Sequence, residues 1–356
     1  MLVTDGGTGR ALSTLGTVRA LAAAGYRPAV STSGGVSLAA ASRFCARAIE
    51  VPPVTDEGYA PAIQAELATW PYLTVLPTSD AALLELGAPV DHLVDKEMLA
   101  GRARAAGLVV PPTETFSSLA ELVAAAPRLD YPVVVKPTVS RSPARRVESA
   151  AELARSLPEA GSIIVQPYLT DPLWAVAGVV FGGKLVAAVH QRYLRIWPPD
   201  CGGACAAVTA EPDLEREAGV LRLLTGYEGI FMAQFAGPHL VDLNPRAYGS
   251  LPLAVAAGAN LAGIWCDLLA GEQRCMVRAR PGVFYRWLEG DLRHLAAAVR
   301  AGTMRPTSAL RALRPRPGAA HGPESLSDPA PMLARLRYAA ARLRERSEAG
   351  SSPTVP

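Results

Sequence analysis

Short apolar runs alternate with helical patterns through the first 90 or so residues, and this alternation constrains the fold more than any other feature. The chain opens with MLVTDG, TVRALAAAGY and RPAVSTS, which predict a strand, a helix and a second strand. AIEVP, IQAELATW and YLTVLPTSDAALLEL continue the same order. Strands separated by helices of this length pair in parallel, so residues 1–90 are expected to form a doubly wound α/β domain.

The first turn from strand to helix reads DGGTGR, residues 5–10. Backbone N–H groups at such a turn can meet an anion. The turn does not spell G-x-G-x-x-G, and no ribose-binding acid follows at the usual distance. Glycines that only permit a tight turn are therefore the favoured interpretation.

A different pattern begins near residue 91 and continues to about residue 275. DKEMLAGRARAAGL and SLAELVAAAPRL are helical, whereas YPVVVKP and SIIVQPYL are apolar strands that end at proline. Two hairpins follow, WAVAGVVFGGKLVAAVHQRYL and GIFMAQFAGPHLVDLNPR, with FGGK and AGPH as their turns. Helices mixed with antiparallel strands predict an α+β region over residues 91–275.

The composition shifts to Arg and Pro beyond residue 276, as in RALRPRPGAAHGP. We expect a small helical extension over residues 276–346, with one helix in DPAPMLARLRYAAARLRER, and a disordered tail over residues 347–356. The helix has a basic face, for which a solvated surface is favoured over nucleic-acid or membrane contact.

Composition limits the classes of function. The chain is 50% hydrophobic and 19% charged, as in soluble globular proteins, and its net charge of +3 is too small to indicate a nucleic-acid partner. It has neither a signal-like N-terminus nor an apolar stretch long enough to span a membrane. Five scattered cysteines do not form a disulfide framework, so a cytoplasmic location is expected.

Oxygen-bearing side chains converge in AQFAGPHLVDLNPR. Residues two apart on a strand share a face, so Asp242 and Asn244 point the same way, with Gln234 across the ladder. Mg²⁺ prefers such oxygen ligands. Arg246 could bind a carboxylate or phosphate through its planar fork. Asn-Pro alone is only a turn signal, so a structural role stays open.

Lysine is rare in this chain. Only Lys96, Lys136 and Lys184 occur, against 32 arginines. Lys136 ends a buried apolar strand, where its ammonium needs either an exit to water or an anionic partner. Lys96 opens a helix after LVD, upstream of the oxygen-rich hairpin.

Taken together, these elements resemble the ATP-grasp superfamily over roughly residues 1–275, with two subdomains that grip the nucleotide. The form with Gln234 first and N-P-R last looks most like carbamoyl-phosphate synthetase and the carboxylate–amine ligases. The resemblance implies Mg²⁺ on Gln234, Asp242 and Asn244. The ATP-binding residues that it implies are Lys96, Lys136, Ser140, Gln166, Tyr168 and Leu169.

The resemblance also implies a reaction. ATP phosphorylates a substrate carboxylate to an acyl phosphate, and an amine then displaces phosphate to form an amide. Such chemistry needs cations around the γ-phosphate more than a strong base, and the expected catalytic residues are Lys136, Arg192 and Arg246. Arg192 is expected to contact the substrate carboxylate, with His190 on the same side of the strand as a weaker candidate base.

Two rival functions stay open. One is an enzyme that phosphorylates a carboxylate or bicarbonate for carboxylation, and the other is a catalytically inactive nucleotide-binding protein. In either active case the partners are small molecules, without nucleic acid or membrane, and a homodimer is compatible with the sequence.

The sequence departs from the superfamily pattern at two places. The loop after Lys136 reads TVSRSPARR and contains no glycine, although this loop is usually glycine-rich. Pro167 stands where a glutamate is common, and no ribose-binding glutamate lies near Leu173 or Trp174. The phosphate end of the site is therefore expected to be better preserved than the nucleoside end.

Overall fold

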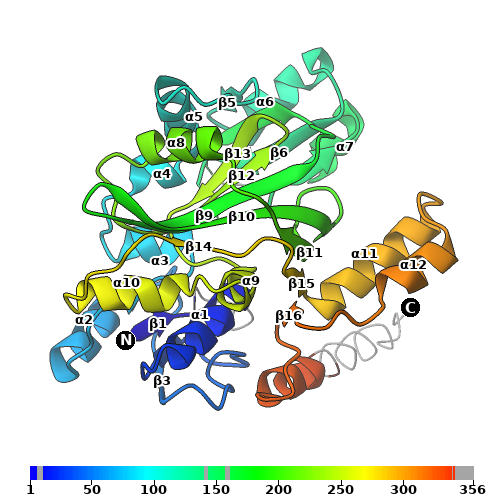
Figure 1. The fold of residues 1–356 in the computed structure, drawn as a ribbon. Helices are drawn as coiled ribbons and strands as arrows, with labels where there is room; N and C mark the ends of the chain where they lie inside the picture. The colour runs from blue at the N-terminus through cyan, green and yellow to red at the C-terminus, as the bar shows by residue number, and fades with distance from the viewer. Residues whose placement is uncertain (6–10, 140–142, 157–160, 339, 341–356) are drawn as a thin grey trace, which may run out of the picture.

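The computed structural model describes residues 1–5, 11–139, 143–156, 161–338 and 340. Three sheets organise this part of the chain, and we name them the N-terminal, small and central sheets. Figure 1 shows the central sheet in the middle of the molecule, with the N-terminal strands below it and the small sheet above. A parallel sheet followed by mixed sheets agrees with the predicted order of an α/β and an α+β region.

The N-terminal sheet is parallel, as the alternation of strands and helices predicted. Its strands pair in the order β3-β2-β1-β4, and every pairing is parallel. The strands are β1 (Leu2–Thr4), β2 (Ala29–Thr32), β3 (Arg47–Glu50) and β4 (Val75–Leu76). The helices of this region are α1 (Leu12–Ala23), α2 (Tyr59–Thr69) and α3 (Asp80–Glu85).

Helices cover both faces of the N-terminal sheet. Successive strand residues point to opposite faces, so Val3 packs in one cluster with Leu15 of α1, and Leu2 packs in another with Ile63 of α2. A parallel strand covered on both faces has no side toward water. This explains why every residue of β1 is fully buried.

The small sheet is antiparallel throughout, in the order β5-β8-β6-β7. Its strands are β5 (Glu114–Phe116), β6 (Val133–Pro137), β7 (Arg145–Val147) and β8 (Ile163–Pro167). Helices α6 (Leu119–Ala125) and α7 (Ala150–Ser156) belong to the same unit. Val133 and Val135 of β6 pack in an apolar cluster with Leu122 of α6, which leaves the alternate residues of β6 to face the other side.

The central sheet runs in the order β13-β12-β9-β10-β11-β15-β16, with β14 beside β10. Its strands are β9 (Leu173–Phe181), β10 (Lys184–Trp197), β11 (Gly203–Thr209), β12 (Gly229–Ala236), β13 (His239–Asn244), β14 (Val277–Arg278), β15 (Phe284–Arg286) and β16 (Ala320–His321). The two predicted hairpins are confirmed as β9–β10 and β12–β13. Gly182 and Gly183 both have positive φ at the first turn, which explains the FGGK signal.

Helices cover both faces of the central sheet as well. On one face Met232 packs in a cluster with α1 and α10 (Leu261–Leu269). On the other face Phe231 packs with α5 (Lys96–Ala105) and α8 (Leu214–Leu223). The short helices α4 (Asp91–Val94) and α9 (Leu251–Ala256) also contribute residues to these two clusters. Phe231 and Met232 are neighbours on β12 and therefore pack against different sets of helices.

The region beyond residue 276 differs from the predicted helical extension. Strands β14, β15 and β16 join the central sheet, so this part of the chain is not only helical. Its helices are α11 (Leu288–Arg300), α12 (Pro306–Ala312) and residues 330–338. A strand of two or three residues is too short to show the alternation by which strands are predicted from a sequence. Its hydrogen bonds are made to strands that are distant in the sequence, so local residues do not indicate it.

Two expectations from composition can be compared with the described residues. All five cysteines are free, in agreement with the expected lack of a disulfide framework. Among the described helices, none combines the length and the apolarity that crossing a bilayer requires.

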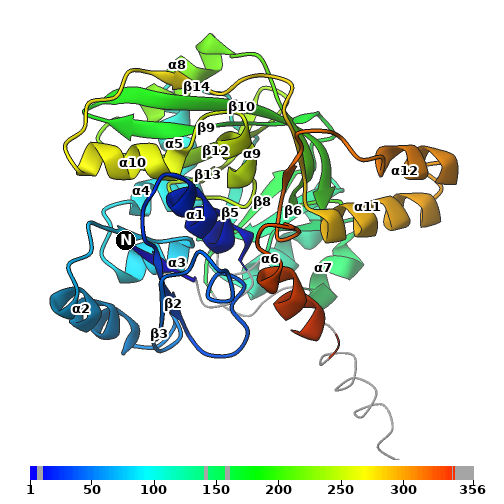
Figure 2. The ribbon, with the colours of Figure 1, turned by 60° about the horizontal axis from the view of Figure 1, so that its bottom comes forward.

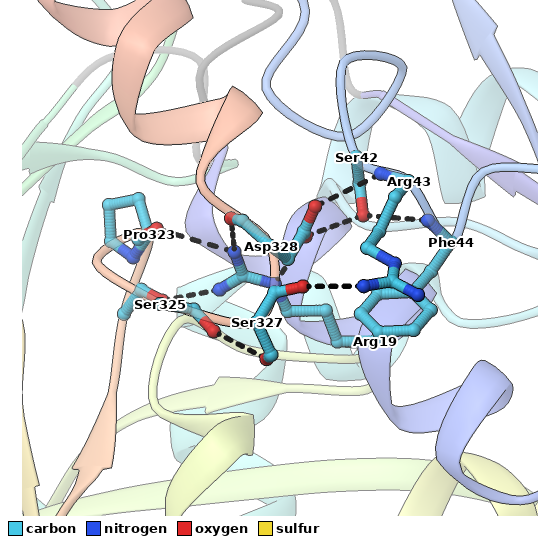
Figure 3. A network of polar contacts seen from close by, with 9 residues as sticks. Arg19, Ser42, Arg43, Phe44, Pro323, Ser325, Ser327 and Asp328 are labelled. Atoms are coloured by element: carbon cyan, nitrogen blue, oxygen red, sulfur yellow. Dashed lines mark hydrogen bonds and ion pairs between the residues drawn. The ribbon is translucent and has the colours of Figure 1, made fainter.

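A buried polar cluster ties residues 322–328 to the N-terminal region, and we call it the C-terminal clasp (Figure 3). Asp328 is fully buried and accepts hydrogen bonds from Arg19 Nε (2.9 Å) and Ser42 Oγ (2.7 Å). Its other carboxylate oxygen accepts from the backbone N–H of Arg43 (3.0 Å). The Arg19 guanidinium also donates to three carbonyl oxygens of residues 322–328. The clasp therefore joins α1 and the segment after β2 to the C-terminal region.

Replacing Asp328 by alanine should destabilise the protein by about 3 kcal/mol, because the largely buried Arg19 guanidinium would lose its charged partner. Chemical unfolding would measure this loss. Asp130→Ala is the matched control, since Asp130 is exposed and should change stability by less than about 0.5 kcal/mol. Equal stability of the Asp328 and Asp130 variants would contradict a stabilising role for the clasp.

Candidate active site

A cavity of about 470 Å³ lies between the small sheet and the central sheet. Its walls come from β6 and β8 of the small sheet, β12 and β13 of the central sheet, and the start of α5. We call it the nucleotide cavity, after the role proposed below. It brings together nine of the predicted site residues: Lys96, Lys136, Gln166, Tyr168, Leu169, Gln234, Asp242, Asn244 and Arg246.

Lys136 reaches the nucleotide cavity because β6 alternates. Val133 and Val135 point into the apolar cluster of the small sheet, so Val134 and Lys136 line the cavity. The Lys136 ammonium crosses to the central sheet and donates a hydrogen bond to Val241 O (2.8 Å). Burial lowers the pKa of Lys136 to about 8; nearby Asp242 acts in the opposite direction.

Lys96 approaches the same carboxylate from another element. It is the first residue of α5, whose N-cap Asp95 accepts hydrogen bonds from the backbone N–H groups of Glu97 and Met98. Lys96 Nζ lies 3.5 Å from Asp242 Oδ1. The predicted helix start at Lys96 is confirmed, and the cap fixes where the ammonium leaves the helix.

The oxygen-rich hairpin has the predicted register. Gln234 is paired with Asp242 across β12 and β13, and Asn244 lies two residues further along β13. All three side chains line the nucleotide cavity. Asn244 Nδ2 donates to Asp242 Oδ2 (3.3 Å), which leaves the amide oxygen of Asn244 to accept from another donor.

That donor is Arg246, and a residue that the sequence analysis did not single out positions it. Arg246 Nη2 donates to Asn244 Oδ1 (2.7 Å), while Nε donates to Asp80 Oδ1 (2.6 Å). Asp80 is 3% exposed and opens α3 of the N-terminal region, directly after the N-cap Ser79. The stretch TSD before an apolar run indicated a helix start, but nothing local indicated a partner 166 residues away.

The donor set fits a hard cation. Gln234, Asp242 and Asn244 offer oxygen atoms on one face of a hairpin, which are the ligands that Mg²⁺ prefers. Only one of the three carries a charge, so substrate phosphates would have to supply further anionic ligands. Within the described ranges, no group of three or more His, Cys, Asp or Glu side chains is placed to hold a metal ion.

The opposite end of the nucleotide cavity is formed where β8 ends. Gln166, Tyr168 and Leu169 line it, and Gln166 Nε2 donates to Thr113 Oγ1 (2.9 Å). Arg146 of β7 lies over the Tyr168 ring at 4.2 Å and donates to Asp200 (3.3 Å). In this structure Arg146 therefore contacts an aromatic ring and a carboxylate.

Arg192 is not brought to the nucleotide cavity. It is exposed on β10 and pairs in register with Trp174, whose ring packs on the face covered by α5 and α8. Gln191, one residue earlier, faces the opposite side and donates to Ser250 Oγ (3.0 Å). Strand alternation thus turns Arg192 away from the site, and we remove it from the candidate residues.

His190 shares the outer face with Arg192. Its Nε2 lies 3.1 Å from Glu217 Oε2 of α8, and Glu217 also accepts two hydrogen bonds from Arg278. His190 is thus part of a buried polar cluster between β10, α8 and β14, away from the nucleotide cavity. The expectation that His190 and Arg192 share a side was correct, but that side is not the one with the cavity.

Two predicted elements cannot be placed. Ser140 lies outside the described residues, and so do residues 6–10, which include the glycine-rich turn of the first strand. Ser140 stays a prediction from the sequence.

Nucleotide binding should weaken above pH 8. The Lys136 ammonium has its pKa lowered to about 8, so it loses its proton as the pH rises through that value. A bound polyphosphate favours the charged form, so binding above pH 8 must take up a proton and should weaken by up to about tenfold per pH unit. Calorimetric titration with ADP in buffers of different ionisation enthalpy would detect the uptake. The variant Lys136→Met should show none of it; equal proton uptake in the variant would assign the effect to another group.

Solved structures share this fold. An ADP complex of N5-carboxyaminoimidazole ribonucleotide synthetase matches with a TM-score of 0.60 and 14% identity, covering 85% of this chain and 84% of that chain. An L-amino acid ligase from Bacillus licheniformis matches with a TM-score of 0.54 and 15% identity, covering 75% and 73%. Biotin carboxylase from Campylobacter jejuni, as a β,γ-ATP complex, matches with a TM-score of 0.54 and 15% identity, covering 76% and 71%. Identities this low support a shared fold and no more.

The fold shared with these structures agrees with the ATP-grasp resemblance found in the sequence. More specifically, residues 159–291 match the family model described as ATP-grasp in the biosynthetic pathway with Ter operon. No curated protein matches the sequence.

Proposed function

We propose that the protein is an ATP- and Mg²⁺-dependent ligase that activates a carboxylate as an acyl phosphate and joins it to an amine. One observation carries this proposal. Two lysines, an arginine and three oxygen ligands from separate elements converge on one cavity between two sheets. Such a set suits phosphoryl transfer, in which positioning and charge stabilisation supply most of the catalysis.

In the first step a carboxylate oxygen attacks the γ-phosphorus of ATP, and the bond from that phosphorus to the β,γ-bridging oxygen breaks. The products are an acyl phosphate and ADP. Lys136 and Lys96 would hold the negative charge of the phosphates, because both ammonium groups lie at the cavity wall beside Asp242. Gln234, Asp242 and Asn244 would hold Mg²⁺, which when bound neutralises phosphate charge.

In the second step the amine nitrogen attacks the acyl carbon, phosphate leaves, and the nitrogen loses a proton to give the amide. Arg246 is suited to stabilise the oxygen that becomes negative, because its guanidinium borders the cavity and is oriented from both sides. Asp80 acts as a positioning residue, since it touches Arg246 and does not line the cavity.

Two alternative functions predict different outcomes. N5-carboxyaminoimidazole ribonucleotide synthetase and biotin carboxylase share the fold, so a carboxylating enzyme that phosphorylates bicarbonate is one of them. A protein that binds nucleotide without turnover is the other, and it is favoured by the lack of a ribose-binding glutamate near Leu173.

An ADP-release screen separates these functions. Purified protein with ATP and Mg²⁺ would be given amino acids and small carboxylic acids in pairs, and separately bicarbonate. The proposed ligase requires ADP release that depends on both members of a pair, with an amide as product. Release with bicarbonate and no organic carboxylate would support the carboxylating enzyme, and ADP binding without any release would support the inactive protein.

A further inference from the structure

A second cavity lies at the N-terminal sheet, outside the site described above. It measures about 460 Å³ and opens at the carboxyl ends of β2 and β3, with the helix of residues 330–338 as a further wall. In open α/β sheets this edge is where ligands commonly bind. The residues that line the cavity are Thr32, Gly34, Gly35, Val36, Ser37, Ala40, Ala41, Glu50, Ala334 and Arg337, and none of them lines the nucleotide cavity.

Opposite charges line this second cavity without pairing. Glu50 comes from the end of β3, and Arg337 comes from the C-terminal helix. In the part of the chain that the structure describes, neither side chain forms an ion pair or a side-chain hydrogen bond. A carboxylate and a guanidinium that face one cavity but stay apart leave room for a ligand that carries both charges.

A buried hydroxyl group without a hydrogen-bond partner also supports ligand binding in this cavity. Thr32 Oγ1 is inaccessible to solvent and has no hydrogen-bond partner among the described residues. Thr32 is paired in register with Glu50 on the neighbouring parallel strand, so both side chains emerge from the same face of the sheet. An unsatisfied buried hydroxyl is costly, and a ligand in the cavity would remove that cost.

Because residue 34 is glycine, the Glu50 carboxylate can lie close to the backbone of the segment after β2. Gly34 has a φ of +83°, and a Cβ atom built there would lie 3.2 Å from Glu50 Oε1. A larger residue at this position would be strained and would also crowd the carboxylate. The glycine therefore keeps the Glu50 side of the cavity open.

The C-terminal clasp holds the two walls of the cavity together. Figure 2 shows the helix that follows residue 328 beside the segment after β2. Within the clasp, Asp328 accepts from Ser42 and Arg43, which end the segment that contributes Ser37, Ala40 and Ala41 to the cavity (Figure 3). The cavity walls are thus fixed by buried contacts rather than by chance proximity of two surfaces.

We propose that this second cavity is a binding site for a small zwitterion of the α-amino acid class. The ammonium group of the ligand donates to Glu50 and to Thr32 Oγ1, and its carboxylate accepts from the Arg337 guanidinium. The site concerns binding alone, so it does not depend on the reaction proposed for the nucleotide cavity.

Calorimetric titration tests this proposal on the full chain without nucleotide, using the common L-α-amino acids one at a time. We expect at least one to bind. Its N-acetyl derivative and its α-amide should each bind at least about tenfold more weakly, because each loses one charged hydrogen-bonding group. If no amino acid binds, or if blocking either end leaves the affinity unchanged, the proposal is wrong.

Substitutions of Glu50 and Arg337 test whether the amino acid binds in this second cavity. Glu50→Gln and Arg337→Gln should each weaken amino acid binding by about tenfold or more, whereas the exposed controls Glu57→Gln and Arg27→Gln should leave it unchanged. ADP binding should be the same in all four variants, which separates this site from the nucleotide cavity. Amino acid binding that Glu50→Gln and Arg337→Gln leave at the wild-type level would overturn the assignment.

Thr32→Val separates binding from folding. Valine keeps the shape of threonine and removes the hydroxyl, so amino acid binding should weaken while the melting temperature of the free protein does not fall. A lower melting temperature with unchanged binding would show that the hydroxyl serves the fold and would remove Thr32 from the site.

Discussion

Lys136→Met should lower kcat/KM for ADP formation by about 10²–10³-fold, the usual cost of removing one donor to a charged transition state. Methionine fills the end of β6 with an apolar chain of similar length, so the fold should persist. The loss comes from the ammonium, which is buried at the cavity wall beside Val241 O and near Asp242. Steady-state ADP release at saturating Mg²⁺ would measure it.

The chain offers a matched control for this experiment. Lys184 is exposed at the turn between β9 and β10 and does not line the nucleotide cavity. Lys184→Met removes the same charge and should leave kcat/KM within about twofold, since it touches no catalytic group. A Lys136 variant as active as the Lys184 variant would refute the assignment of Lys136 to the phosphates.

Asp242→Asn should raise the Mg²⁺ concentration needed for half-maximal activity by at least about tenfold. Asp242 is the only charged member of the three proposed oxygen ligands, and losses of 10- to 100-fold are typical even for residues that only support a metal ligand. The same carboxylate raises the pKa of Lys136, so its removal should also shift the pH dependence of ADP binding to lower pH.

Two measurements check this prediction. Activity titrated with Mg²⁺ gives the metal requirement, and calorimetric ADP binding across pH gives the shift. Asp130→Asn is the control, because Asp130 is exposed and does not line the nucleotide cavity. A metal requirement equal to that of the control would exclude Asp242 as a ligand.

Local patterns singled out several residues that the structure places around one cavity. The buried apolar strand before Lys136 indicated that its ammonium needs an exit to water or an anionic partner, and the D-x-N spacing placed Asp242 and Asn244 on one face. Both inferences use only residues that are neighbours on one strand or hairpin, where geometry follows from the chain itself. The resemblance added Gln166, Tyr168 and Leu169, which also line the cavity.

Arg192 and Asp80 show where local reasoning stops. Alternation says that Arg192 and Gln191 point to opposite faces, but it does not say which face holds the cavity. Asp80 looks like an ordinary acid at the first turn of a helix, and only folding brings it to Arg246. The second cavity is similar, since Glu50 and Arg337 line it from segments far apart in the sequence.

The amino-acid sequence by itself determined the parallel N-terminal sheet, the two hairpins and the shared face of Asp242 and Asn244, because periodicity and turn chemistry act over a few residues. Only the tertiary structure decided which strand face became the cavity wall, which acid positions Arg246, and that residues 330–338 close a cavity on β2 and β3. These depend on how separate layers pack, and packing energy is shared among residues far apart in the chain.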